Sequence, residues 1–173
     1  MKRVLVIGCP GSGKSTFSRA LRDLTGLPLC HLDLLYHNAD RTTVPKEVFD
    51  ARLAEVLERD EWIMDGNFQR TMERRLAACD SVFLLDYPVE VCLAGVESRI
   101  GRNRPDMPWV EQEFDPEFRQ FIENFATVSL PKIYALLDAW AGKREIVIFK
   151  SRAEADAYLD AMRREGREGG ETR

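Results

Sequence analysis

The stretch that decides the fold is Gly8-Cys9-Pro10-Gly11-Ser12-Gly13-Lys14-Ser15. It matches G-x-x-x-x-G-K-[ST] at every fixed position, which is the pattern of a loop that binds phosphate groups. Its glycines permit backbone conformations that side chains would block, so that successive N–H groups can point inward at phosphate oxygens. The apolar segment Arg3–Gly8 predicts a buried strand before the loop, and Ser15–Leu24 is expected to form a helix after it. The strand, loop and helix therefore occur in the order that the pattern requires.

The loop predicts that the protein binds a nucleoside triphosphate together with Mg²⁺. The helix after the loop directs the positive end of its dipole at the phosphates. We expect Lys14 to bridge the β- and γ-phosphates and the Ser15 hydroxyl to bind Mg²⁺. The residues expected to contact the nucleotide are Gly8, Gly11, Ser12, Gly13, Lys14, Ser15 and Thr16.

The loop alone leaves open how the phosphate is used. A GTPase switch carries an N-K-x-D motif that reads the base, and no asparagine of this sequence is followed by lysine. An ATPase that drives a distant event couples to a partner domain, whereas 173 residues make about one domain. The remaining class is a small kinase, with a nucleoside triphosphate as donor and a small molecule as phosphate acceptor.

The segments on either side of the loop predict an α/β fold. Stretches with helical periodicity separate short apolar segments, and this alternation predicts a parallel sheet with helices on both faces. Three of the expected strands end on an acidic residue, and parallel sheets bind ligands at the carboxyl ends of their strands. The expected strands are Arg3–Gly8, Leu29–Asp33, Glu61–Asp65, Ser81–Asp86 and Glu145–Phe149.

Apolar spacing and capping residues place the helices. Lys46–Arg59 carries an apolar stripe, and Asp115-Pro116-Glu117 supplies the cap, proline and acid that open a longer helix. Pro131 is expected to interrupt that helix before Ile133–Trp140 resumes it. Ser151-Arg152-Ala153-Glu154 is a capping box that opens the last helix.

We expect one domain over residues 1–164 and a flexible tail over residues 165–173, which are mostly Gly, Glu and Arg. Within the domain, the segment from about residue 33 to 60 is expected to bind the acceptor, and residues 102–118 to form a short lid. Such a lid excludes water, so that the acceptor is phosphorylated in preference to water.

The composition, 45% hydrophobic and 31% charged, is that of an ordinary globular protein. The formal charge of -4 argues against a protein that coats nucleic acid, because such binding needs a surplus of Lys and Arg. No segment is long and apolar enough for a signal peptide or a membrane span. The four cysteines show neither Cys-x-x-Cys nor zinc-ligand spacing, so we expect a reducing, cytoplasmic location.

Charged residues outside the loop point to phosphoryl transfer, which depends on positioning and charge neutralisation. Arg99, Arg102 and Arg104 lie together at a helix end, and we expect them to cover the donor phosphates. Capping of the helix C-terminus is the alternative, and it explains one arginine more easily than all three. Asp33, at the end of the second expected strand, either orients the acceptor and takes its proton or caps a helix.

One further motif resembles a known family. Asp65-Gly66-Asn67-Phe68-Gln69-Arg70-Thr71 is similar to the strand-end motif of adenylate kinases, Asp-Gly-Phe-Pro-Arg-Thr, with one residue inserted. The resemblance implies that Asp65 organises the magnesium shell and that Arg70 grips the acceptor phosphate. A solvated position on a helix is the alternative for Arg70.

A wider resemblance spans about residues 2–160. Together with the phosphate loop, four short motifs resemble bacterial P-loop proteins of the DNA topology modulation (FlaR-like) family, which are themselves adenylate-kinase-like. The resemblance implies ATP as the donor and a five-stranded sheet in the order 2-3-1-4-5. Residues 37–43 depart from the family pattern, and the net charge gives no support to DNA binding. The four motifs are His31-Leu32-Asp33, Asp65-Gly66-Asn67-Phe68, Arg104-Pro105-Asp106-Met107 and Pro131-Lys132-Ile133.

The sequence thus predicts transfer of a phosphoryl group from ATP, with Mg²⁺, to a nucleoside monophosphate or another small acceptor. Two alternatives remain open. One is a kinase of the shikimate-kinase type, because the segment over residues 34–60 is short for enclosing a nucleotide base. The other is a nucleotide-dependent regulator that hydrolyses ATP slowly or not at all.

Overall fold

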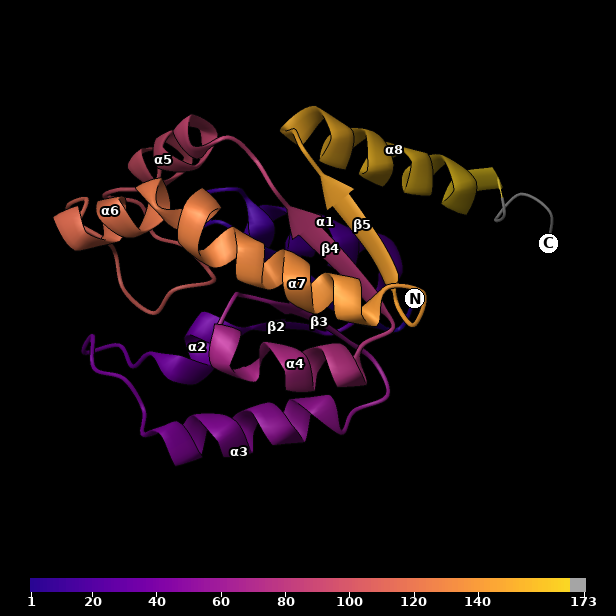
Figure 1. Cartoon of the computed structure of the whole chain (residues 1–173), viewed down its shortest axis with the longest axis horizontal. Helices are drawn as coiled ribbons and strands as arrows, with labels where there is room; N and C mark the ends of the chain where they lie inside the picture. The colour runs from indigo at the N-terminus through magenta and orange to yellow at the C-terminus, as the bar shows by residue number, and fades with distance from the viewer. Residues whose placement is uncertain (169–173) are drawn as a thin grey trace.

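The computed structural model describes residues 1–168 and has a five-stranded sheet whose strands are all parallel (Figure 1). The strand order is β2-β3-β1-β4-β5, which confirms the expected fold class and order. β1, which enters the phosphate loop, lies in the centre of the sheet. The strands are β1 (Arg3–Gly8), β2 (Leu29–His31), β3 (Trp62–Asp65), β4 (Ser81–Leu85) and β5 (Glu145–Phe149).

Helices cover both faces of the sheet because the central strands are apolar on both sides. Val4, Leu5, Val6 and Ile7 of β1 are completely buried. On one face, α1 packs on the sheet and against α8, and on the other α4 packs against β1 and α7 (Figure 1). The helices are α1 (Lys14–Thr25), α2 (Leu32–Tyr36), α3 (Lys46–Leu57), α4 (Gln69–Ala78), α5 (Val89–Glu97), α6 (Pro116–Glu123), α7 (Leu130–Trp140) and α8 (Arg152–Glu168).

The second strand ends earlier than the sequence predicts. His31 pairs with Asp65, the last residue of β3, so the chain beyond His31 has no strand beside it to continue the ladder. Leu32 instead begins α2, and Asp33 lies in the first turn of that helix. This shift turns Asp33 from a strand-end residue into a helical one.

The α-helix ends at Glu123 and a new one begins at Leu130, so the expected interruption is present, but it falls just before Pro131. Pro131 lies in the first turn of α7, where a missing N–H costs no helical hydrogen bond. The irregularity precedes it, as a π-helical turn over Phe125–Ser129. At the last helix, Ser151 Oγ accepts the N–H of Glu154 at 3.3 Å, and the Glu154 carboxylate accepts the N–H of Lys150 at 2.8 Å. The side chains of the expected capping box therefore both cap the start of α8.

The expected boundary between domain and tail also shifts. α8 continues to Glu168, so residues 165–168 are helical, and residues 169–173 of the expected tail lie outside the described residues. Within residues 1–168, no helix has the length and apolar character needed to cross a membrane.

Candidate active site

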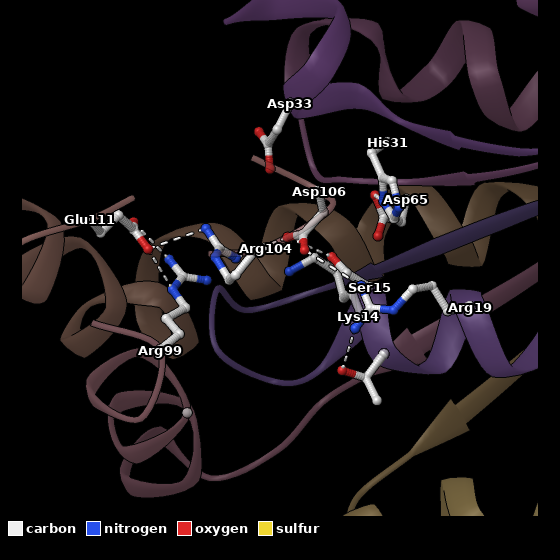
Figure 2. Close-up of polar contacts among 12 residues, drawn as sticks. Lys14, Ser15, Arg19, His31, Asp33, Asp65, Arg99, Arg104, Asp106 and Glu111 are labelled. Atoms are coloured by element: carbon white, nitrogen blue, oxygen red, sulfur yellow. Dashed lines mark hydrogen bonds and ion pairs between the residues drawn. The ribbon is translucent and has the colours of Figure 1, made fainter. Parts of the chain in front are cut away.

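An open cleft of about 860 Å³ lies at the carboxyl ends of β1 and β3. The phosphate loop and the start of α1 form its floor, α2 and the segment after β3 form one wall, and the segment between α5 and α6 forms the other. This last segment is the expected lid. Figure 2 shows charged side chains from α1, α2, the end of β3 and the expected lid around this cleft.

Lys14 lies against its own loop. Its Nζ donates hydrogen bonds to the carbonyl oxygens of Gly8 at 2.9 Å and Cys9 at 3.0 Å. Burial lowers the pKa of Lys14, and the nearby carboxylate of Asp65 partly opposes this effect. The ammonium group is thus held at the bottom of the cleft, where the pattern of the loop places donor phosphates.

The loop is also held by a close approach of two backbones. A Cβ atom at Gly11 would lie 1.9 Å from the Cys92 carbonyl oxygen, and one at Gly95 of α5 would lie 2.0 Å from the Gly11 carbonyl oxygen. Both contacts are shorter than any side chain tolerates. Glycine at these two positions therefore allows α5 to support the loop directly.

Replacing Gly95 by alanine is expected to displace the phosphate loop. Overpacking of this kind costs about 1–3 kcal/mol of folding free energy, which the protein relieves by moving the loop out of its binding conformation. A loss of 1.4 kcal/mol of binding free energy weakens affinity about tenfold. We therefore expect the Kd for Mg·ATP, measured by calorimetry, to rise about tenfold. Gly166→Ala is the matched control, because Gly166 lies in α8 with open space around it. An unchanged Kd in Gly95→Ala would show that the contact does not shape the loop.

Asn67 and Arg75 connect the segment after β3 to the loop. The side chain of Asn67 donates to the Gly8 carbonyl oxygen at 2.7 Å and accepts the Gly8 N–H at 3.0 Å. Arg75, completely buried on α4, donates to the carbonyl oxygens of Gly66 at 2.9 Å and Phe68 at 3.1 Å, and also to that of Asn67. The sequence predicts no role for Arg75, because a lone arginine in a helix carries no signal of burial.

Asp106 brings the lid onto the phosphate loop. Its carboxylate accepts hydrogen bonds from Ser15 Oγ at 3.2 Å and Arg104 Nη1 at 2.9 Å, and it lies 3.5 Å from Arg19 Nη1 (Figure 2). Asp106 is buried, with 5% of its surface exposed. Sequence reasoning missed Asp106 and Arg19 as site residues, although Asp106 belongs to one of the motifs that carry the wider resemblance.

The expected lid arginines separate into two groups. Arg99 and Arg104 line the cleft and share the carboxylate of Glu111, with N–O distances of 2.9 Å and 3.2 Å. Burial lowers the pKa of Arg99, and the positive charge of Arg104 adds to this effect. Arg102 is exposed and does not line the cleft. The structure therefore brings two of the three arginines to the site.

Asp65 lies at the end of β3, as expected, and is buried. Its Oδ1 lies 3.0 Å from Nδ1 of His31, a residue to which the sequence analysis gives no role. Its Oδ2 is buried and has no hydrogen-bond partner among the described residues. A buried carboxylate oxygen without a partner is costly, so this atom is suited to a cation or to water molecules around one.

Asp33 reaches into the cleft from α2, on the side opposite Lys14 and Ser15 (Figure 2). Burial raises its pKa, and the Asp65 carboxylate adds to this effect, whereas Lys14 and His37 oppose it. His37 Nε2 lies 4.0 Å from Asp33 Oδ1, and the His37 ring meets Trp109 of the lid edge-on at 5.0 Å. The wall formed by α2 therefore carries a carboxylate and an aromatic contact to the lid.

Arg70 is not brought to the cleft. It lies near the start of α4 and forms an ion pair with Asp50 of α3, with an N–O distance of 2.6 Å. The cleft lining does not include it. The arrangement matches the alternative of a solvated helix position rather than a grip on an acceptor phosphate.

Replacing Arg70 by alanine is accordingly expected to leave kcat and the KM for the acceptor within about twofold of the unaltered protein. Steady-state kinetics check this, and Asp50→Ala is the matched variant because it removes the other half of the same ion pair. A large rise in the acceptor KM in Arg70→Ala alone would restore the role that the adenylate kinase motif implies.

Comparisons with known proteins agree with this fold. Residues of this chain are 30% identical over 97 positions to the adenylate kinases of Thermotoga petrophila and Thermotoga maritima. The match covers 54% of this chain and 43% of each adenylate kinase, so the chain matches less than half of the length of these relatives. No family model matches the chain.

Solved structures of small kinases superpose on almost the whole chain. Shikimate kinase from Acinetobacter baumannii, in complex with shikimate, has a TM-score of 0.62 at 18% identity, covering 94% of this chain and 90% of that one. A gluconokinase from Sinorhizobium meliloti has a TM-score of 0.55 at 14% identity, covering 96% and 94%. At these identities the likeness shows the fold, that of P-loop kinases. The narrower resemblance to DNA topology modulation proteins stays a prediction.

Proposed function

We propose that the protein transfers a phosphoryl group from ATP, with Mg²⁺, to a small acceptor. The observation that carries this proposal is the set of charges around one cleft. Lys14 and Ser15 of the phosphate loop face the carboxylates of Asp33 and Asp65 and the lid residue Arg104. Phosphoryl transfer needs these parts: a cradle for the donor, a place for the metal and cations over the transferred group.

On the donor side, the loop amides hold the phosphates and Lys14 bridges the β- and γ-phosphates. Arg99 and Arg104 neutralise the charge that develops during transfer. Both arginines now share Glu111, and donor phosphates would compete with that carboxylate for them. Arg70 and Arg102 have no part in this proposal, since neither lines the cleft.

Mg²⁺ fits the residues between the loop and β3. Ser15 Oγ and the unpartnered Oδ2 of Asp65 are the oxygen atoms that would hold the ion or its water shell. Among residues 1–168, no three His, Cys, Asp or Glu side chains form a metal-binding group. Mg²⁺ at a kinase site takes one or two protein ligands together with substrate phosphates and water. The bound ion would supply positive charge to the donor phosphates.

The comparisons support a kinase and leave two kinds of acceptor. The sequence relatives bear the name of adenylate kinase, whose acceptor is already phosphorylated. The structural neighbours bear the names of shikimate kinase and gluconokinase, whose acceptors carry hydroxyl groups. In both groups the acceptor is a small molecule.

Calorimetry with Mg·ATP, followed by release of ADP with and without acceptors, tests the proposal. We expect saturable binding that needs Mg²⁺ and is lost or strongly weakened in a Lys14→Ala variant. A protein that does not bind Mg·ATP, or binds it equally well without Lys14, would contradict the proposed function.

A further inference from the structure

We propose that the acceptor is a small molecule that offers a hydroxyl group, and that the carboxylate of Asp33 takes the proton of that hydroxyl during transfer. This inference rests on the proposed function and specifies its acceptor. It departs from the nucleoside monophosphate that the adenylate kinase resemblance implies.

The first observation is the position of Asp33. Its side chain points from α2 into the cleft, across from Lys14 and Ser15 (Figure 2). Among the described residues no group donates a hydrogen bond to its carboxylate. His37 Nε2 lies 4.0 Å from Asp33 Oδ1, and burial lowers the pKa of that imidazole, which favours its neutral form. A hydroxyl placed between Asp33 and the donor phosphate can donate such a hydrogen bond, whereas a phosphate dianion cannot.

The second observation is the charge of this side of the cleft. An acceptor phosphate would approach the carboxylates of Asp33 and Asp65, which line the cleft, whereas the charge of Asp106 is offset by Arg19 and Arg104. Like charges at such short range are unfavourable in a partly buried site. The cation that would offset them in the adenylate kinase motif, Arg70, is paired with Asp50 outside the cleft. A neutral hydroxyl meets no such repulsion.

The third observation concerns the cations that do line the cleft. Arg99 and Arg104 share Glu111, and Arg104 and Arg19 also contact Asp106, so these three are committed to the lid and the donor side. Arg41 lies on the acceptor side, where it is exposed and donates to the Val110 carbonyl oxygen at 3.5 Å. Arg41 lines the cleft and can bind an anionic substituent of the acceptor. The acceptor class therefore includes hydroxy acids as well as neutral polyols.

A bond forms between the acceptor oxygen and the γ-phosphorus of ATP, and the bond from that phosphorus to the β,γ-bridging oxygen breaks. The electron pair of the broken bond leaves with ADP. The proton of the hydroxyl moves to the Asp33 carboxylate, which later returns it to water. The product is a phosphate ester.

The charges facing Asp33 set the pH at which it can act. Asp65 and Asp106 face it from β3 and the lid, Lys14 from α1 and His37 from the end of its own helix. Burial and the two carboxylates raise its pKa, so the carboxylate form appears at a higher pH than for an exposed aspartate. The rate should rise with pH as Asp33 loses its proton, and the rising limb should lie above the usual range of a free carboxyl.

The first experiment compares two acceptor panels in the presence of Mg·ATP. One contains AMP, CMP, GMP and UMP, and the other glycerol, glucose, gluconate and shikimate, with products identified by phosphorus NMR. We expect at least one hydroxyl compound to raise ADP release about tenfold or more above water alone and to yield a phosphate ester, and no nucleotide to yield a diphosphate.

The second experiment tests the role of Asp33 with the best acceptor of that panel. Asp33→Asn should lower kcat by about 10²- to 10⁴-fold and remove the rising limb of the pH–rate profile. Its Kd for Mg·ATP should not increase, which shows that the variant is folded. Asp138→Asn, an exposed position on α7, is the matched control and should leave kcat and the profile unchanged.

The outcomes separate this inference from the proposed function. Loss of Mg·ATP binding in the unaltered protein would overturn both. Normal Mg·ATP binding with conversion of a nucleoside monophosphate to a diphosphate would overturn the hydroxyl acceptor alone. Normal Mg·ATP binding with no stimulation of ADP release by any hydroxyl compound would also overturn the hydroxyl acceptor. An Asp33→Asn variant that keeps both its kcat and the rising limb of its pH–rate profile would overturn the role of Asp33.

Discussion

Replacing Lys14 by alanine is expected to lower kcat/KM for Mg·ATP by about 10²- to 10³-fold, the usual cost of removing one group that stabilises transition-state charge. Lys14 lies at the floor of the cleft, and its ammonium group contacts the loop carbonyls of Gly8 and Cys9. The shortened side chain can neither reach the donor phosphates nor carry their counter-charge. ADP release in the presence of an acceptor measures the effect.

The charge of Lys14 also predicts a loss of activity at high pH. Burial lowers the pKa of this ammonium, so its proton is lost at a lower pH than that of an exposed lysine. Activity should therefore decline on the alkaline side as Lys14 becomes neutral. Lys132→Ala is the matched control, because Lys132 is exposed on α7 and should leave both the rate and the alkaline limb unchanged. A Lys14→Ala protein with normal turnover would remove the basis for assigning the loop to donor binding.

The fold could be predicted largely because its signals are local. The phosphate loop is a continuous motif, and the buried strand before it and the helix after it lie next to it in the chain. The order of the strands is not local, and it came from the resemblance to adenylate kinases. The end of β2 could not be predicted, because it depends on where β3 stops: His31 pairs with Asp65, and Asp33 has no strand partner.

The site was predicted less completely because its contacts join distant parts of the chain. Ser15 and Asp106 meet across 91 residues, and His31 and Asp65 across 34. No spacing rule finds such pairs. Arg70 shows the opposite case, in which a motif suggests a contact that the fold does not make. The motif carries one inserted residue, and a shift of one position turns a helical side chain by about 100°. Arg70 faces Asp50 of α3.

Replacing Arg75 by methionine is expected to destabilise the protein by about 3–4 kcal/mol, although Arg75 is not itself one of the residues that line the cleft. The guanidinium group is completely buried and donates to the carbonyl oxygens of three successive residues, Gly66, Asn67 and Phe68. Each buried acceptor that loses its donor costs about 1–3 kcal/mol. Chemical denaturation measures the free energy of unfolding, and Tm should fall by about 10 °C.

The same substitution should also weaken nucleotide binding, because the three carbonyls belong to the segment that supports the phosphate loop. One of these residues, Phe68, has a positive φ angle of 34°, which a residue with a side chain rarely adopts, so the segment is held in a conformation that it does not favour alone. When Arg75 is lost, Asn67 is no longer held against Gly8. Arg74→Met is the control: Arg74 is exposed on the same helix, and its loss should change stability by no more than about 0.5 kcal/mol. If the Arg75→Met and Arg74→Met variants are equally stable, Arg75 does not hold the segment. If Arg75→Met is destabilised but binds Mg·ATP with unchanged affinity below its Tm, the segment does not position the loop.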